Sequence, residues 1–146
     1  MEVHENILTV QSLSKVYQNN SITLEVLKNI SFDVRKGEFV AIVGSSGCGK
    51  TTLLRCLAGL ISFTKGKIIF NGEALQADVG MIFQEFSAFP WLTVRKNIEL
   101  GLEFKKIPQQ ERRPIIDHYL AVTGLKEYAD FYPKSLSGGM KQRVAI

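Results

Sequence analysis

Residues 39–51 read F-V-A-I-V-G-S-S-G-C-G-K-T, an apolar run that leads directly into a glycine-rich loop. The first five residues are all apolar, as in a strand that is covered on both faces. The loop fits the pattern G-x-x-x-x-G-K-[ST]. A helical pattern over residues 51–60 follows, with four leucines expected on one face: Leu53, Leu54, Leu57 and Leu60. Strand, loop and helix in this order predict a phosphate-binding loop in an α/β fold.

The residue types of this loop suit a nucleotide. Glycines let successive backbone N–H groups curl around a phosphate without side-chain clashes, and the helix N-terminus adds a positive dipole end. Lys50 is placed to reach the β- and γ-phosphates, and Thr51 to offer its hydroxyl to Mg²⁺. A chance match in a chain of this length is on the order of 1%, so a mere glycine-rich turn is disfavoured. The predicted ATP contacts of the loop are Gly44, Ser45, Ser46, Gly47, Cys48, Gly49, Lys50, Thr51 and Thr52.

The segments on either side of the loop have strand patterns. Residues 30–35 alternate between apolar and polar, which predicts a half-buried strand. Residues 66–72 predict another strand that ends in the tight-turn dipeptide Asn71-Gly72. Residues 79–83 form a third apolar run.

After about residue 90 the pattern becomes helical. Thr93 is placed to cap a helix that carries Val94, Ile98 and Leu102 at four-residue spacing. A second helix is expected to carry Ile115, Ile116, Tyr119 and Leu120, with Pro114 in its first turn and Gly124 just after its end. Strands first and helices later predict a β-rich part followed by a helical part.

Composition narrows the class of protein. The chain has 146 residues, 45% hydrophobic and 22% charged, as one ordinary globular domain would. The net charge is +4, but the basic residues come in pairs instead of runs, which argues against a nucleic-acid partner. Cys48, Cys56, His4 and His118 have no partners at metal-ligand or catalytic spacing, so the cysteines are interpreted as reduced thiols. No membrane-spanning run or signal-peptide layout is present, and the sequence predicts a cytosolic chain.

The last twelve residues, 135–146, read S-L-S-G-G-M-K-Q-R-V-A-I and look like the start of a helix without a C-terminal cap. A phosphate loop alone does not separate kinases, GTPases, helicases and transport ATPases. The tail resembles the signature motif of ATP-binding cassette (ABC) ATPases, usually written LSGGQ, with methionine in the last position. The resemblance assigns this motif to Leu136, Ser137, Gly138, Gly139 and Met140.

Two further positions match the motifs of this family. Tyr17 precedes the first expected strand pair, where the family places an aromatic ring that stacks on adenine. Gln84 closes the run 79–83 and matches the Q-loop glutamine, which reaches Mg²⁺ and the attacking water. The resemblance thus implies catalytic roles for Lys50 and Gln84, and Mg²⁺ contacts for Thr51 and Gln84. Taken alone, Tyr17 could equally be a surface or core tyrosine, and Gln84 an ordinary residue at a strand end.

The segment 84–94, Q-E-F-S-A-F-P-W-L-T-V, resembles the importers for nitrate, taurine and aliphatic sulfonates within the family. Clustered aromatic residues in a short loop suggest a docking groove for a partner helix. The resemblance implies that the partner is the cytoplasmic coupling helix of a transmembrane permease. The alternative is that these side chains pack the helical part onto the strands. The predicted docking residues are Phe86, Phe89, Trp91 and Leu92.

The resemblance also defines what to expect of the fold. It implies a P-loop NTPase of the ABC ATPase type, α/β, with an antiparallel β subdomain, a helical subdomain and an incomplete core sheet. Residues 1–146 would be the N-terminal part of one such domain: about 1–90 the β subdomain and Walker A core, about 91–146 the helical subdomain. No Walker B strand ending in Asp-Glu is found, so residues 39–43 would lack their neighbouring strand. We therefore expect the 146-residue chain to be poorly stable and prone to aggregation.

By this resemblance, the intact protein is an ATP-binding subunit of an importer that couples ATP binding and hydrolysis to solute uptake. A second copy would dimerise head to tail, so that Ser137 and Gly139 cap the neighbour's ATP. A permease would hold the subunit at the inner face of the membrane, and a solute-binding protein would act indirectly. Two alternatives stay open: an ATP-binding fragment or pseudo-enzyme without hydrolysis, and an exporter or non-transport member. The sequence does not identify the solute.

Overall fold

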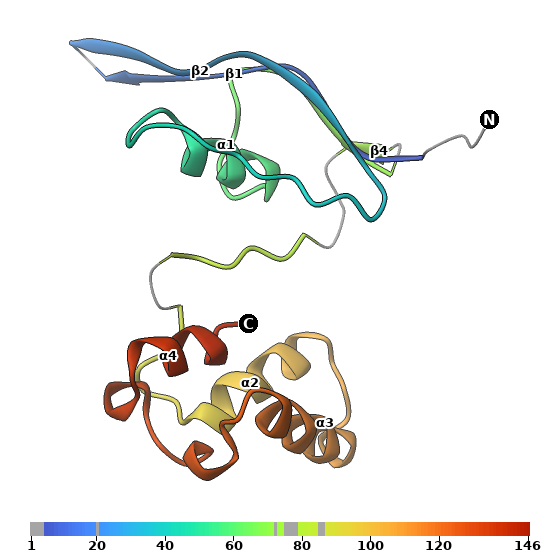
Figure 1. The fold of residues 1–146 in the computed structure, drawn as a ribbon, viewed down its shortest axis with the longest axis vertical. Helices are drawn as coiled ribbons and strands as arrows, with labels where there is room; N and C mark the ends of the chain where they lie inside the picture. Colours follow the sequence, from blue (N-terminus) through green and yellow to red (C-terminus); the bar gives the residue numbers. More distant parts are fainter. Residues whose placement is uncertain (1–4, 20, 72, 75–78, 85–86) are drawn as a thin grey trace. The chain divides into compact units, whose positions relative to one another are not determined.

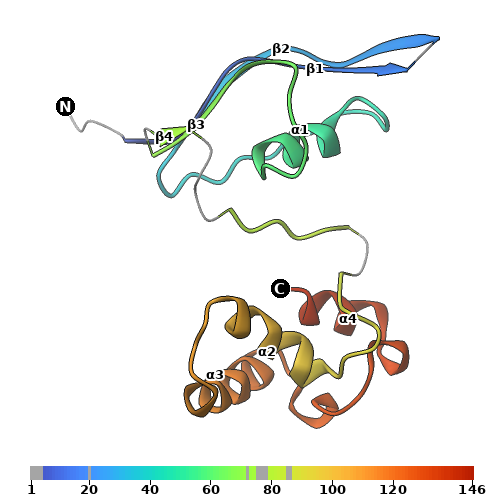
Figure 2. The same ribbon diagram turned by 180° about the vertical axis from the view of Figure 1, so that it is seen from behind.

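The structure is a computed structural model that describes residues 5–19, 21–71, 73–74, 79–84 and 87–146. The chain divides into two compact units, Met1–Met81 and Ile82–Ile146, shown in Figures 1 and 2. We call them the β unit and the helical unit, and each is described by itself.

The β unit is built on an antiparallel sheet. Its strands are β1 (Asn6–Asn19), β2 (Ile22–Arg35), β3 (Lys65–Phe70) and β4 (Glu73–Ala74), in the order β2-β1-β3-β4. The strands expected at 30–35 and 66–72 correspond to β2 and β3, although β2 is much longer than its predicted part. Strand β3 ends at Phe70, Asn71 is a turn residue, and Gly72 lies outside the described residues. Within β2, Ile30, Phe32 and Val34 are partly buried while the residues between them are exposed, as the alternation predicts.

Strand β1 is the longest element that sequence patterns did not reveal. Its pairing with β2 shifts register between Val10 and Leu13, and Ser12 has a left-handed φ of 50°. A bulge of this kind breaks the two-residue period by which strands are recognised. Tyr17 therefore lies within β1, paired with Leu24 of β2, and the expectation that it precedes the first strand pair is wrong.

Helix α1 (Lys50–Leu57) lies against one face of the sheet (Figures 1 and 2). Its buried side chains join the sheet's in one core made of Leu8, Val10, Leu13, Leu27, Leu53, Cys56, Leu57 and Ile68. Burial raises the pKa of the Cys56 thiol, and nearby Lys15 only partly offsets this rise. The predicted four-leucine face is half right, because Leu54 and Leu60 are 44% and 52% exposed.

Residues 39–43 do not form the strand that their apolar run predicts. Among the described residues no strand pairs with this run, and the side chains of Phe39 and Val43 are 93% and 88% exposed. A strand needs a neighbour to accept its backbone hydrogen bonds, so an apolar run alone is insufficient. Residues 79–83 are likewise without strand structure, and Ile82 is 61% exposed.

The helical unit contains α2 (Val94–Phe104), α3 (Gln109–Val122) and α4 (Gly138–Val144), with short 3₁₀ turns at Lys126–Tyr128 and Pro133–Ser135. The Thr93 hydroxyl accepts from the Lys96 amide at 3.3 Å, which confirms the predicted cap of α2. The core of the unit consists of Val94, Ile116, Leu120, Leu125, Ala129, Leu136 and Val144. Across the described ranges, the helices are too short or too polar to cross a membrane.

Helix α3 differs from its prediction at one end. Pro114 was expected in the first turn, but the helix begins five residues earlier, at Gln109. Proline lacks the N–H that would donate to the carbonyl of Gln110. Gln110 is exposed, so water can satisfy that carbonyl and the helix continues through the proline. The predicted apolar positions Ile116 and Leu120 are buried, as expected.

Candidate functional site

The glycine-rich loop, residues 44–49, connects the exposed apolar run to α1. Gly47 and Gly49 have φ values of 81° and 100°, a left-handed conformation that disfavours other residues. A Cβ added at Gly49 would lie 3.0 Å from the carbonyl oxygen of Val26 and 3.1 Å from Cδ2 of Leu27. The loop therefore packs closely on β2, and a side chain at Gly49 would be both crowded and strained by the left-handed backbone. A Cβ at Gly47 would meet nothing within 4 Å, so the backbone there faces open space.

The first turn of α1 presents backbone donors beside this loop. Leu53 N donates to Gly49 O at 2.8 Å, whereas among the described residues no backbone carbonyl accepts from the amides of Lys50, Thr51 or Thr52. No side chain caps this end of the helix. Free amides and the positive end of the helix dipole favour an anionic ligand at this position.

Lys50 places its ammonium group inside the loop. Its Nζ donates to Gly44 O at 2.9 Å and to Ser45 O at 2.7 Å, and it lies 3.7 Å from Cys48 Sγ. In the described part of the chain, no carboxylate forms an ion pair with Lys50. The positive charge is held by neutral carbonyls only, so it remains available to a phosphate group.

The remaining loop residues fit a nucleotide with Mg²⁺. A Cβ added at Gly44 would lie 2.8 Å from Cys48 Sγ, so a side chain there would displace the thiol. Thr51 is exposed at the start of α1. Among the described residues there is no cluster of His, Cys, Asp and Glu that could hold a metal ion. Mg²⁺ commonly binds through one or two protein groups plus substrate phosphates, and this arrangement suits the Thr51 hydroxyl.

Tyr17 lies in the same unit as the loop. Its ring is 44% exposed, and Lys15 Nζ lies 4.8 Å from the ring centroid. Tyr17 pairs with Leu24, three residues along β2 from Leu27, against which Gly49 packs. Three residues of strand span about 10 Å. A nucleotide with its phosphates on the loop can reach across such a distance with its base.

The signature residues form the beginning of α4 in the helical unit. The Ser137 hydroxyl accepts from the Met140 amide at 3.4 Å and caps the helix. Leu136 is buried and Met140 packs against the same core, so these two residues anchor the motif. Gly138 and Gly139 are exposed between them. Gln84 also lies in this unit, exposed and outside any strand.

The predicted docking residues lie before α2. The rings of Phe89 and Trp91 have centroids 5.3 Å apart and are 40% and 69% exposed. Leu92 is partly buried, and Phe86 lies outside the described residues. A further exposed aromatic residue, Phe131, was not indicated by the sequence pattern. It adjoins the start of α2, where its carbonyl accepts from Val94 N at 2.9 Å. Exposed aromatic residues near the start of α2 thus come from two chain segments.

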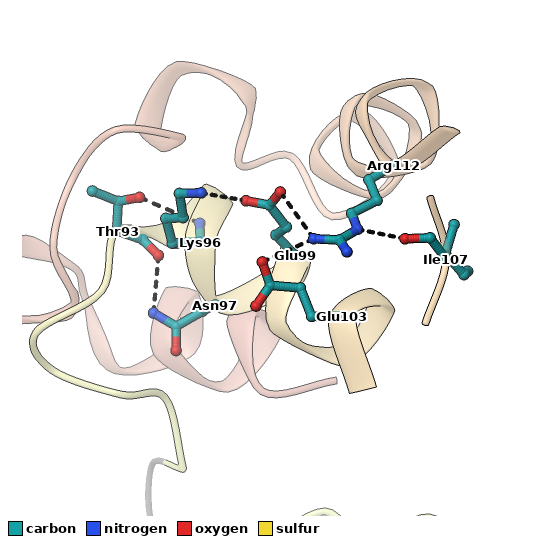
Figure 3. Close-up of polar contacts among 7 residues, drawn as sticks. All are labelled: Thr93, Lys96, Asn97, Glu99, Glu103, Ile107 and Arg112. Atoms are coloured by element: carbon teal, nitrogen blue, oxygen red, sulfur yellow. Dashed lines mark hydrogen bonds and ion pairs between the residues drawn. The ribbon is translucent and has the colours of Figure 1, made fainter. Parts of the chain in front are cut away.

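A polar network that sequence patterns also missed joins α2 to α3, as Figure 3 shows. The carboxylate of Glu99, only 8% exposed, accepts from Lys96 Nζ at 2.6 Å and lies 3.7 Å from an Arg112 nitrogen. The hydrogen bond from Lys96 holds the pKa of Glu99 below its ordinary value, despite the opposing effect of burial. Arg112 also donates to Ile107 O at 2.7 Å and to Glu103 at 2.8 Å.

This network borders a cavity of about 390 Å³, lined by Arg95, Glu99, Gln109, Arg112, Arg113 and Ile116. None of the predicted site residues lines it. Its basic groups are shared with acidic partners: Arg95 donates to Asp117 at 2.8 Å, and Arg112 to Glu103. The glycine-rich loop, with an uncompensated lysine and free amides, is the better candidate for the functional site.

A phosphate loop on an antiparallel sheet, followed by a helical unit with an L-S-G-G motif, defines a class of nucleotide-binding protein. Residues 27–146 match the ABC transporter family, and the chain belongs to that family. The resemblance drawn from the sequence motifs is confirmed.

Two curated relatives illustrate the similarity. An uncharacterized ABC transporter ATP-binding protein of Methanocaldococcus jannaschii is 45% identical over 142 residues, covering 95% of this chain and 53% of that protein. The nitrate import ATP-binding protein NrtD of Synechocystis is 46% identical with the same coverage. The chain therefore spans about half the length of the curated relatives it matches.

Solved structures agree with the predicted fold class. The dimeric structure of MJ0796, a bacterial ABC transporter cassette, matches with a TM-score of 0.85 and 32% identity, over 95% of this chain and 67% of that one. A post-hydrolysis state of MJ0796 bound to ADP and Pi matches with a TM-score of 0.82 and 31% identity, over 94% and 66%. The P-loop fold of the ABC ATPases is thereby confirmed.

Proposed function

We propose that this chain carries the ATP-binding loop of an importer's ATPase subunit, and that residues 1–146 are the N-terminal part of one ABC ATPase domain. The observation that carries the proposal is the position of the Lys50 ammonium group. This group lies within the loop without a described carboxylate partner, beside the free amides of Thr51 and Thr52. Binding of polyphosphate would supply the missing negative charge.

Each residue of the site has a distinct task in this proposal. Bound ATP would supply a phosphoanhydride bond and negative charge, and the loop and Mg²⁺ would neutralise that charge together. Lys50 and the amides of Lys50, Thr51 and Thr52 would hold the phosphates, and the Thr51 hydroxyl would be offered to Mg²⁺. Gln84, which belongs to the helical unit, keeps only the role that its sequence motif implies. Tyr17 offers its exposed ring to the base, with Lys15 over the ring.

A second copy of the protein is the first proposed partner. Ser137 and Gly139 are exposed at the start of α4, while Leu136 and Met140 fix the motif to the core. An exposed motif that is anchored at both ends is suited to contact a neighbouring molecule. The dimers described for the MJ0796 cassette support a dimer. We propose that its two copies are arranged head to tail, so that Ser137 and Gly139 of one copy complete the ATP site of the other.

A transmembrane permease is the second proposed partner. Phe89 and Trp91 expose a tilted ring pair that an apolar helix of the permease can bury. The nitrate importer among the relatives supports an importer for nitrate or a similar anion. The subunit would then lie on the cytoplasmic face of the membrane, with a solute-binding protein acting through the permease.

The alternative is an ATP-binding protein that does not hydrolyse ATP. The experiment is to purify the full-length natural protein from detergent-solubilised membranes and measure ATP hydrolysis. We expect a polytopic membrane protein to copurify, and hydrolysis to disappear in Lys50→Ala. Binding without hydrolysis would favour the alternative, and absence of a membrane protein would contradict the importer proposal.

A further inference from the structure

The segment Phe89–Thr93, which we call the aromatic loop, is held by one side chain of α2. The Asn97 Oδ1 atom accepts from the Phe89 amide at 2.7 Å. Its Nδ2 group lies within hydrogen-bond distance of three carbonyl oxygens: Phe89 at 3.2 Å, Leu92 at 3.1 Å and Thr93 at 2.9 Å. Since an amide nitrogen carries two hydrogens, these three carbonyls share two donors.

The placement of Asn97 lets it act on both ends of the aromatic loop. Its own backbone amide donates to Thr93 O at 2.9 Å within the first turn of α2, so its Cα is fixed by the helix. Figure 3 shows the side chain turned back toward Thr93. From there it contacts residues eight, five and four positions earlier in the chain. Within the loop itself, Leu92 N donates to Phe89 O at 3.1 Å.

Burial does little to hold Trp91, the most exposed of the loop's aromatic residues. Its side chain is 69% exposed, and its described ring contact is with Phe89, itself 40% exposed. The direction in which these rings point therefore depends on the backbone of the loop. Asn97 bonds that backbone directly, through both the amide and the carbonyl of Phe89.

We propose that Asn97 is a positioning residue that holds the aromatic loop in the shape that receives an apolar partner helix. The proposal rests on the docking role given to Phe89 and Trp91 under the proposed function. Asn97 fits this task because it both accepts and donates. Aspartate retains the acceptor for Phe89 N but places a negative charge against three carbonyl oxygens. Alanine loses all of these contacts.

The test uses Trp91, the single tryptophan of the chain, as its probe. Acrylamide quenching and fluorescence anisotropy are measured for the unmodified chain, Asn97→Asp and Asn97→Ala. Lys105→Ala, at the exposed C-cap position just after the same helix, is the matched control. Far-UV circular dichroism and ATP affinity are recorded for every variant. We expect quenching to rise and anisotropy to fall in both Asn97 variants, with helix content and ATP affinity unchanged and the control like the unmodified chain.

Two results would overturn the positioning role. Unchanged quenching in both Asn97 variants would mean that other contacts hold the loop. Loss of helix content in both variants, Asn97→Asp included, would mean that Asn97 stabilises the fold of the helical unit instead of specifically positioning the aromatic loop. Either result is read from the chain alone, so it does not depend on any partner.

A second arm separates this inference from the proposed function. The membrane subunit captured with the full-length protein is titrated with Asn97→Asp and with Trp91→Ser. We expect both substitutions to weaken assembly about tenfold, or 1.4 kcal/mol. If Asn97→Asp loosens Trp91 but neither substitution weakens assembly, the docking role is wrong while the loop geometry stands. If only Trp91→Ser weakens assembly, docking stands and Asn97 does not control it.

Discussion

The two units of this chain treat their apolar residues differently. In the helical unit, residues from α2, α3 and α4 meet in one core that includes Val94, Leu120 and Val144. In the β unit, α1 and the sheet form a core, yet the apolar run 39–43 stays exposed beside the glycine-rich loop. An amphipathic helix needs only a packing surface, whereas a strand also needs a neighbouring strand for its backbone. The helices of the helical unit find their packing partners within the same unit, whereas the run 39–43 finds no neighbouring strand among the described residues.

Charge is distributed just as unevenly. All five ion pairs between described residues lie in the helical unit, where they join α2 and α3 or neighbouring turns. In the β unit, Lys50 contacts backbone carbonyls. Charges in the helical unit serve its own packing, and the charge on Lys50 is left for a ligand. The predictions below test this contrast.

The largest effect is expected at Lys50. Lys50→Ala removes a charge-assisted contact to phosphate, so ATP affinity should fall roughly 100-fold, or about 3 kcal/mol. Lys36→Ala, at an exposed turn of the same unit, is the control and should bind normally. Isothermal titration calorimetry measures both. Equal ATP affinities of Lys50→Ala and Lys36→Ala would contradict the claim that the charge on Lys50 is available to a ligand.

The next effect concerns the apolar residues. Leu120→Ala should destabilise the helical unit by about 3 kcal/mol, because the leucine is fully buried. Phe39→Ala should change stability by less than about 0.5 kcal/mol, since that ring is 93% exposed. Urea unfolding followed by circular dichroism compares the two. A large loss on Phe39→Ala would show that the run 39–43 packs in solution.

Two neighbouring arginines allow a matched test of the polar network. Arg112→Met should cost about 2 kcal/mol, because it removes hydrogen bonds to Glu103 and Ile107 and the longer ion pair with Glu99. Arg113→Met should have little effect, since that side chain is 87% exposed and lies 4.0 Å from Asp117. Similar unfolding midpoints for the two variants would contradict the role of the network.

The cap of α2 gives a smaller effect. Thr93→Ala removes the hydroxyl that accepts from Lys96 N and should cost about 1 kcal/mol. Thr93→Ser keeps the hydroxyl and serves as control. Thermal unfolding of the two variants and the unmodified chain measures the difference. If serine and alanine destabilise equally, the hydroxyl does not cap the helix.

The smallest effect is a dependence on pH. Hydrogen bonds from Lys96 and Arg95 lower the pKa of Glu99 and Asp117 below their ordinary values of 4.5 and 3.8. Their stabilisation is present above those values and is lost as the pH falls through the lowered pKa values. Urea unfolding of the helical unit at pH 7, 5 and 3 should show the loss mainly below about pH 4.5. Glu99→Gln should flatten the profile, and an unchanged profile would exclude Glu99 as a source.

The features that were predicted correctly from the sequence are those determined by residues close together in the chain. The Thr93 cap and a helix start within residues 135–146 were predicted because each is indicated by residues close together in the sequence. Strand β1 was missed because its bulge near Ser12 breaks the period, and the start of α3 because Pro114 looked like a first-turn proline. These errors come from local exceptions that tertiary packing tolerates.

The remaining features depend on contacts between distant residues. The apolar run 39–43 was predicted as a strand, but a strand forms only with a neighbour that residue patterns do not supply. Glu99 and Arg112 are thirteen positions apart and meet only when α2 packs on α3. Asn97 was overlooked because its side chain bonds the backbone of an irregular loop that precedes it in the chain, and no periodic pattern indicates such contacts.

The central claim is that the glycine-rich loop binds nucleotide phosphates. Amide-resolved NMR of the chain, titrated with Mg-ATP, tests it most directly. We predict saturable shifts of the amides of residues 47–52, whose environment an added phosphate changes, with residues 97–120 unaffected. Shifts confined to the helical unit, or no saturable shifts at residues 47–52, would contradict the claim.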